Sequence, residues 1–238
     1  MKKILTIAKK EYLAYLTNPA GYILGGLFLL VSSWLYFQDF FLIKQADVSN
    51  LWIIMIFLFT LLIPAISMNL FADEKRNGNW EIILSLPVSE KELVLGKFLG
   101  SLGYLLTVSM LIFPVILTVN YLGDPEWGLV VGGGLGLGFL AASYLACGLL
   151  GSSLSSQPIV GFMVTTVILL VNNFIGQDFF LAKIQSNGLA SFLAYLSLSR
   201  HGIKMGSGLI GLDDVAFYFS WISIFLILTV VSLKSRDR

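Results

Sequence analysis

Long apolar stretches alternate with short polar segments along the chain. Six stretches contain no Asp, Glu, Lys or Arg, and each has at least the roughly 18 residues that a helix needs to cross a bilayer. They are residues 20–37, 51–72, 98–122, 127–150, 159–176 and 215–233. The pattern predicts an all-α membrane protein with six transmembrane helices in a single transmembrane domain, residues 1–238, and both termini on the same side.

The segment before the first span, residues 1–18, is amphipathic. On a helix its apolar residues share one half of the surface, its four lysines lie on the other half, and Glu11 interrupts the pattern. Asn18-Pro19 ends the helix, because the residue before a proline disfavours helical geometry. We predict an interfacial helix, which either anchors the first span or contacts a cytoplasmic partner.

Composition and charge support a membrane location and give an orientation. Hydrophobic residues make up 57% of the chain and charged residues 12%, whereas charged residues are about a quarter of a soluble domain. With the N-terminus inside, most of the lysines and arginines lie on the cytoplasmic side, as the positive-inside rule requires. The near-neutral net charge of +1, without a clustered basic patch, gives no indication of nucleic-acid binding.

The spans lack the chemistry of several protein classes. Ion-coupled carriers need ionisable groups at membrane depth, and no proposed span contains one. One Cys, Cys147, and one His, His201, cannot form a metal site of several ligands. We expect His201 to be an exposed residue of the outer segment 177–214. Within that segment Leu189 to Leu198 is too short to span, which predicts a re-entrant or interfacial helix pair.

Small and polar residues within the spans point to helix packing. Span four is rich in glycine, which lets helices approach closely, and we expect Gly134 and Gly138 to be such positions; a functional hinge is the alternative. Span five carries amides and hydroxyls that either bond between helices or line a translocation path. These path candidates are Asn172, Asn173, Thr165 and Thr166.

The polar segment after span two, residues 73–97, is the most informative part of the chain. It carries charges of both signs around a short amphipathic stretch that ends at Pro87, as expected of a cytoplasmic loop that contacts another protein. The candidate interface residues are Glu74, Lys75, Arg76, Gly78, Trp80, Glu81, Ile83, Leu84, Leu86 and Pro87. The segment holds no nucleotide site, because Gly96-Lys97 is followed by Phe98 and is not preceded by the glycine of a phosphate loop.

The run ADEKRNGNWEIILSLPVSEKELVLGKFLG, residues 72–100, resembles the signature of type-2 ABC exporter permeases. In its length, its six spans without charged residues and its short loops, the chain is most similar to the gliding-motility, sodium-extrusion and nitrous-oxide-reductase-maturation permeases. The resemblance implies a permease dimer, of identical or different subunits, in the bacterial cytoplasmic (inner) membrane, with cytoplasmic termini. It also implies that loop 73–97 docks on a separate ABC ATPase subunit, which binds ATP and Mg, so that this chain is not itself an enzyme.

Two functions remain open from the sequence. One is the permease subunit of an ABC transporter, which couples ATP hydrolysis by the partner to export. The other is a membrane subunit that transmits force or a signal to an extracytoplasmic accessory protein without moving a solute. Neither the substrate nor the direction of transport is encoded in a recognisable motif.

Overall fold

The computed structural model describes residues 2–43, 47–78, 80, 87–123, 125–184 and 186–236, and the regular structure within them is α-helical. The helices are α1 (Lys2–Thr17), α2 (Pro19–Ile43), α3 (Ser49–Ser67), α4 (Asn69–Arg76), α6 (Glu90–Met110), α7 (Phe113–Leu122), α8 (Trp127–Ser153), α9 (Pro158–Ile175), α10 (Asp178–Leu181), α11 (Asn187–Leu196), α12 (Leu198–Gly206) and α13 (Leu212–Arg236).

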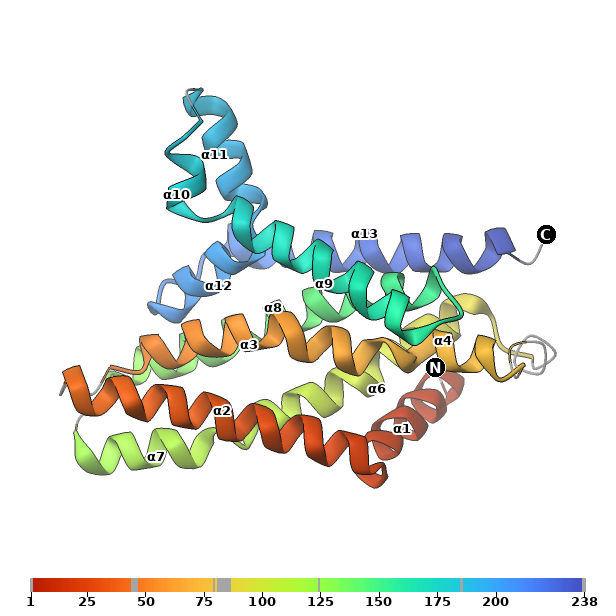
Figure 1. Cartoon of the computed structure of the whole chain (residues 1–238), viewed down its shortest axis with the longest axis horizontal. Helices are drawn as coiled ribbons and strands as arrows, with labels where there is room; N and C mark the ends of the chain where they lie inside the picture. Colours follow the sequence, from red (N-terminus) through yellow and green to blue (C-terminus); the bar gives the residue numbers. More distant parts are fainter. Residues whose placement is uncertain are drawn as a thin grey trace.

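The prediction of an all-helical chain with six membrane-spanning helices is confirmed. The six candidate spans are Pro19–Leu42, Ser49–Arg76, Glu90–Leu122, Trp127–Ser153, Pro158–Ile175 and Leu212–Lys234. In Figure 1 the long helices run along the long axis of the molecule, with α1, α4 and the C-terminus towards one end and α12 towards the other. Helices α3 and α4 together form span two, and α6 and α7 together form span three.

Helix α8 is the centre of the bundle and packs against α3, α6, α9, α12 and α13. Its glycines permit this close packing at specific positions. A Cβ atom on Gly132 would lie 2.6 Å from the carbonyl oxygen of Met205, and one on Gly136 would lie 2.8 Å from Met205 Cβ. The glycine-rich face therefore receives the short helix α12, as small residues in membrane helices commonly do.

The expectation of close packing is wrong, for the folded subunit, at Gly134 and Gly138. A Cβ atom on Gly134 would meet nothing within 4 Å, and one on Gly138 would meet only Leu106 Cδ2 at 3.6 Å. Both face an apolar groove between α6, α7, α8 and α13. The glycines of α8 lie on more than one face of the helix, and the sequence does not show which of these faces is covered.

Segment 177–214 contains three short helices and the start of α13. Helix α12 packs against α8 and α3, whereas α10 and α11 stand away from the bundle (Figure 1). The expectation that His201 is an exposed loop residue is wrong. It lies in α12 with only 6% of its surface exposed, because both ring nitrogens have polar partners and aromatic side chains cover the ring.

Candidate functional site

The predicted interface loop begins where α4 extends span two and ends where α6 begins. Of its candidate residues, Glu74, Lys75, Arg76, Gly78, Trp80 and Pro87 belong to the described part of the chain, whereas Glu81, Ile83, Leu84 and Leu86 lie outside it. The described residues show how the two ends of the loop are held against the helices. These contacts form the candidate site.

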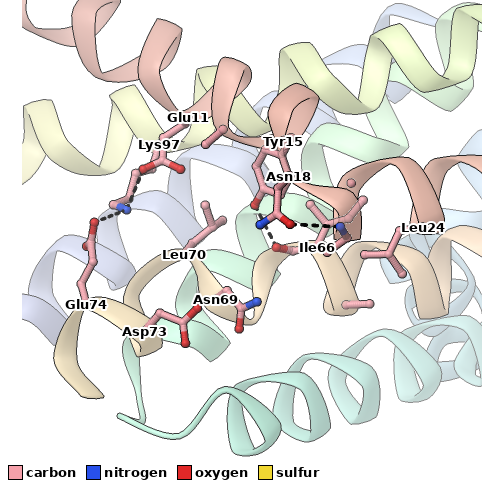
Figure 2. Close-up of a pocket in the computed structure, with 14 residues that line it drawn as sticks. Glu11, Tyr15, Asn18, Leu24, Ile66, Asn69, Leu70, Asp73, Glu74 and Lys97 are labelled. Atoms are coloured by element: carbon pink, nitrogen blue, oxygen red, sulfur yellow. Dashed lines mark hydrogen bonds and ion pairs between the residues drawn. The ribbon is translucent and has the colours of Figure 1, made fainter. Parts of the chain in front are cut away.

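A buried ion network links three helices beneath the loop. The Lys97 Nζ atom, on α6, lies 2.9 Å from Glu11 Oε1 on α1 and 2.7 Å from Glu74 Oε1 on α4 (Figure 2). The Lys97 side chain is 3% exposed, and the two glutamates retain 14% and 18%. A buried charge is costly unless it is paired, so each carboxylate stabilises the ammonium and fixes its own helix to α6.

The network forms because α1 lies directly on α6. A Cβ atom on Gly96 would lie 2.6 Å from Ile7 Cβ, and one on Gly100 would lie 2.5 Å from the carbonyl oxygen of Ala8. These two glycines, four residues apart, let the two backbones approach closely. Glu11 interrupts the apolar half of α1 because its carboxylate reaches Lys97.

Tyr15 joins α1 to span two. Its hydroxyl donates to the carbonyl oxygen of Ile66 at 2.9 Å, and its ring stacks on Tyr104 with centroids 4.9 Å apart. Burial raises the pKa of the Tyr15 hydroxyl well above its ordinary range, which keeps it protonated and able to donate. Helix α1 is thus fixed to α3, α4 and α6, and movement of any of these helices changes the packing of α1.

Helix α4 is also attached to the C-terminal end of α8. The Lys75 Nζ atom donates to the carbonyl oxygen of Ser153 at 2.5 Å. The Ser152 hydroxyl accepts from the backbone N–H of Phe71 at 3.0 Å and donates to the carbonyl oxygen of Met68 at 2.9 Å. Ser152 therefore satisfies backbone groups at the junction where α3 ends and α4 begins.

The start of the loop folds back on α4. Gly78 has a φ of 70°, in the left-handed region that favours glycine, and this turn follows the last residue of α4. The Trp80 ring then packs edge-on against Phe71 with centroids 6.3 Å apart, and Lys75 Nζ lies 5.3 Å from its centroid. Trp80 therefore lies against α4 of its own subunit. Arg76 is more exposed and pairs with Asp73 at 3.6 Å.

The far end of the loop is fixed at α6 and α1. Ser89 and Glu92 form a capping box, in which the Ser89 hydroxyl accepts from the Glu92 N–H and the Glu92 carboxylate accepts from the Ser89 N–H. The carbonyl oxygen of Pro87 accepts a hydrogen bond from Lys3 Nζ of α1. Both ends of the loop are therefore attached to helices that the Lys97 network joins.

The site joins several helices at the base of the loop. A cavity of about 200 Å³ lies beside the network, lined by residues of α1, α2, α3, α4 and α6 that include Glu11, Asp73 and Glu74 (Figure 2). Among the described residues no group of three or more His, Cys, Asp or Glu side chains could hold a metal ion. What the arrangement can do is transmit displacement of the loop to several spans through short, buried contacts.

Of the polar residues of span five, the two asparagines bond between helices and the two threonines do not. Asn172 donates to the carbonyl oxygen of Leu196 at 3.0 Å, and Asn173 donates to Thr60 Oγ1 at 2.8 Å and accepts from the Tyr144 hydroxyl at 2.6 Å. The Thr165 hydroxyl donates to the carbonyl oxygen of Gly161, four residues earlier in α9, at 2.8 Å. Thr166 has a buried hydroxyl without a hydrogen-bond partner. A role for these residues along a translocation path stays a prediction.

Sequence reasoning did not identify the residues that organise the site. The sequence alone indicates Lys97 as part of a motif and Glu11 as a break in an amphipathic pattern. The signal was present in both cases, since each is a charged residue beside an otherwise apolar surface, where an opposite charge is the usual partner. Ser152 and Ser153 are the last two residues of α8, and their contacts with α4 have no local sequence signal.

The comparison with protein families gives a match to nearly the whole chain. A family model described as "ABC-2 family transporter protein" matches residues 5–238. No curated protein matches. The matched region includes most of α1, the loop and all six spans.

Proposed function

The chain belongs to the ABC-2 family of transporter proteins, and from this premise we propose that its loop 73–97 receives the movement of a separate ATPase subunit and passes it to the spans. ATP and Mg are bound by that partner. Membership of the family makes the chain an integral membrane protein and supports its assignment as the permease subunit of an ABC transporter. The proposal adds where the partner binds and how its movement enters the membrane.

The Lys97 network is the observation that carries the proposal. A loop that only connects two spans would not need a buried lysine shared between α1 and α4 directly beneath it. Because displacement of α4 would leave the largely buried Glu74 carboxylate without its cation, α4, α6 and α1 are energetically favoured to move together. A displacement of the loop would then move spans two and three and the N-terminal helix together.

The remaining features follow from the family and belong to the same proposal. The permease works with a second permease subunit, identical or different, in the bacterial cytoplasmic membrane, and both termini face the cytoplasm with the ATPase. This orientation is supported by the excess of Lys and Arg in the segments at the α1 end of the bundle. An extracytoplasmic accessory protein would contact the opposite end.

The proposal is tested by the variant Leu84→Asp, with Glu90→Ala as control. If the apolar stretch of the loop is buried in the partner, a charge at Leu84 should weaken binding by a few kcal/mol, because the groove excludes water. Loss of Glu90, a charge at the rim, should cost at most about 1 kcal/mol. Each permease is co-expressed with its ATPase and purified by a tag on the permease, and the ATPase that co-purifies is measured.

The expected result is loss of the ATPase from the Leu84→Asp sample and its retention with Glu90→Ala. Both variants should insert into the membrane in normal amounts, because neither residue lies in the apolar part of a span. Equal recovery of the ATPase with Leu84→Asp and the parent would contradict the assigned interface.

A further inference from the structure

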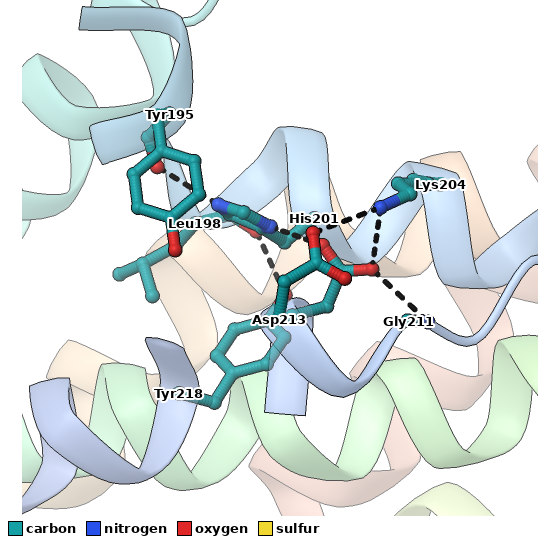
Figure 3. Close-up of polar contacts among 8 residues, drawn as sticks. Tyr195, Leu198, His201, Lys204, Gly211, Asp213 and Tyr218 are labelled. Atoms are coloured by element: carbon teal, nitrogen blue, oxygen red, sulfur yellow. Dashed lines mark hydrogen bonds and ion pairs between the residues drawn. The ribbon is translucent and has the colours of Figure 1, made fainter. Parts of the chain in front are cut away.

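The end of the bundle opposite α1 contains a buried histidine, His201, whose two ring nitrogens both have polar partners. The ring of His201, on α12, stacks on Phe217 with centroids 4.4 Å apart. It meets the ring of Tyr195 edge-on, with centroids 5.1 Å apart (Figure 3). Its two nitrogens reach different elements. Nδ1 lies 2.5 Å from Asp214 Oδ1 on α13, and Nε2 lies 2.8 Å from the carbonyl oxygen of Tyr195 on α11.

Both partners of the ring are hydrogen-bond acceptors. A carbonyl oxygen can only accept, so Nε2 must carry a proton to form its bond. The other oxygen of Asp214 receives Lys204 Nζ at 2.8 Å and the backbone N–H of Gly211 at 3.2 Å, an environment that favours the ionised carboxylate. Nδ1 must then also donate, and only the doubly protonated, charged imidazole makes both bonds.

We propose that His201 is a protonation-dependent latch that holds the last turn of α11 against α12 and α13 when the ring is charged and lets α11 move when the ring becomes neutral. On loss of one proton, the carboxylate of Asp214 retains the remaining proton on Nδ1. The lone pair of Nε2 then faces the lone pairs of the Tyr195 carbonyl oxygen, and the attraction between them becomes repulsion. Acid therefore closes the latch and base opens it.

The charges around the ring fit this role. On α12 itself, the hydrogen bond to Asp214 holds the pKa of Lys204 above its ordinary value, so Lys204 stays charged across the range in which histidines ordinarily titrate. Lys204 also pairs with Asp213, and Arg200 pairs with Asp178 of α10. Each of these charged groups therefore has a partner of opposite charge, whatever the charge of the ring.

The other surfaces packed against α12 present neutral groups near the ring. Helices α3 and α8 contribute Ile56 and Leu140 beside Gly202, and α13 adds the hydroxyl of Tyr218, which donates to the carbonyl oxygen of Leu198 at 2.8 Å. From α9, Asn172 accepts from the backbone N–H of Leu198 at 2.9 Å. Asp214 is thus the group whose charge most directly sets the protonation of His201.

The element that the latch would release is suited to movement. Helices α10 and α11 stand away from the bundle in Figure 1, and α11 exposes large apolar side chains, including Leu189 and Phe192. A second bond to the end of α11, from Asn172 Nδ2 to the carbonyl oxygen of Leu196, does not depend on His201. Opening of the latch should therefore let α11 pivot about this end rather than detach.

The protonation state can be measured directly, because His201 is the only histidine in the chain. The full-length protein, purified with a tag that contains no histidine, is labelled with ¹⁵N-histidine and its imidazole signals are recorded between about pH 5 and pH 9. We expect two protonated nitrogens at the acid end and a single proton, on Nδ1, at the alkaline end. A ring that is already neutral at pH 5, or one that keeps its only proton on Nε2, would overturn the proposal.

Movement of α11 is measured by distances between spin labels on cysteines that replace Phe192 and Tyr121, both exposed, in a Cys147→Ala background. We expect the parent to change from one distance distribution to another as the ring loses its proton. His201→Gln should give a distribution that does not respond to pH. A parent distribution that stays the same while the ¹⁵N signals report deprotonation would show that the ring is not a latch.

The variant Asp214→Asn provides the matched test of the mechanism. Removal of the carboxylate takes away the charge that stabilises the imidazolium, so the distance change should occur at lower pH than in the parent. An unchanged midpoint would contradict the role of Asp214. If this variant fails to fold, the ¹⁵N titration and the distance measurement on the parent still decide between the two outcomes.

Discussion

Replacement of Lys97 by methionine tests the ion network beneath the loop. Methionine keeps most of the length of the lysine side chain and removes its charge, so the packing between α1 and α6 is largely retained. The change leaves the carboxylates of Glu11 and Glu74, 2.9 Å and 2.7 Å from the former ammonium, without their shared cation. Like charges on α1 and α4 would then face each other across the position that the ammonium occupied.

The size of the effect follows from burial. Removal of one partner from a buried ion pair costs about 3–5 kcal/mol. Because the glutamate side chains retain 14% and 18% exposure, water compensates part of this loss, and we expect about 3 kcal/mol, the lower end of the range. At roughly 2–4 °C per kcal/mol for a chain of this size, the midpoint of thermal unfolding should fall by about 6–12 °C.

The assay is thermal unfolding of the purified subunit, followed by the fluorescence of its five tryptophans. The matched control is the triple variant Glu11→Gln, Glu74→Gln and Lys97→Met, in which no charge is left unpaired. Removal of a whole buried ion network is often nearly neutral, so the triple variant should recover most of the lost stability. A Lys97→Met subunit as stable as the parent would refute the energetic role of the network.

Two further predictions concern packing and topology. Gly100→Leu should lower the unfolding midpoint because it forces α1 away from α6. Gly134→Leu should leave it nearly unchanged, because a Cβ atom there would meet no other part of the subunit within 4 Å; equal midpoints would contradict the packing. Single cysteines at Asn77 and Asn187, in a Cys147→Ala background, should react with an impermeant thiol reagent from opposite faces of the membrane, and reaction of both from the outside would invert the proposed orientation.

The spans were predictable because each is a long apolar run, and the bilayer requires such a run wherever a helix crosses it. The Lys97 network was not predictable, because Glu11, Glu74 and Lys97 are far apart in the sequence and meet only after α1 folds onto α6. The same reason applies to His201, whose burial depends on α12 lying against the glycines of α8. Local pattern gives the helices, and contacts between distant residues give the site.

The central claim is that the loop between α4 and α6 contacts an ATP-binding partner. It is tested most directly by a photo-crosslinking amino acid at Asn77, an exposed loop residue, with the same group at Leu212, exposed at the other end of the bundle, as control. After irradiation in cells, captured chains are probed with a photoreactive ATP analogue. The account predicts an ATP-binding chain captured from Asn77 and not from Leu212, and its absence from the Asn77 sample, or equal capture from both positions, would contradict it.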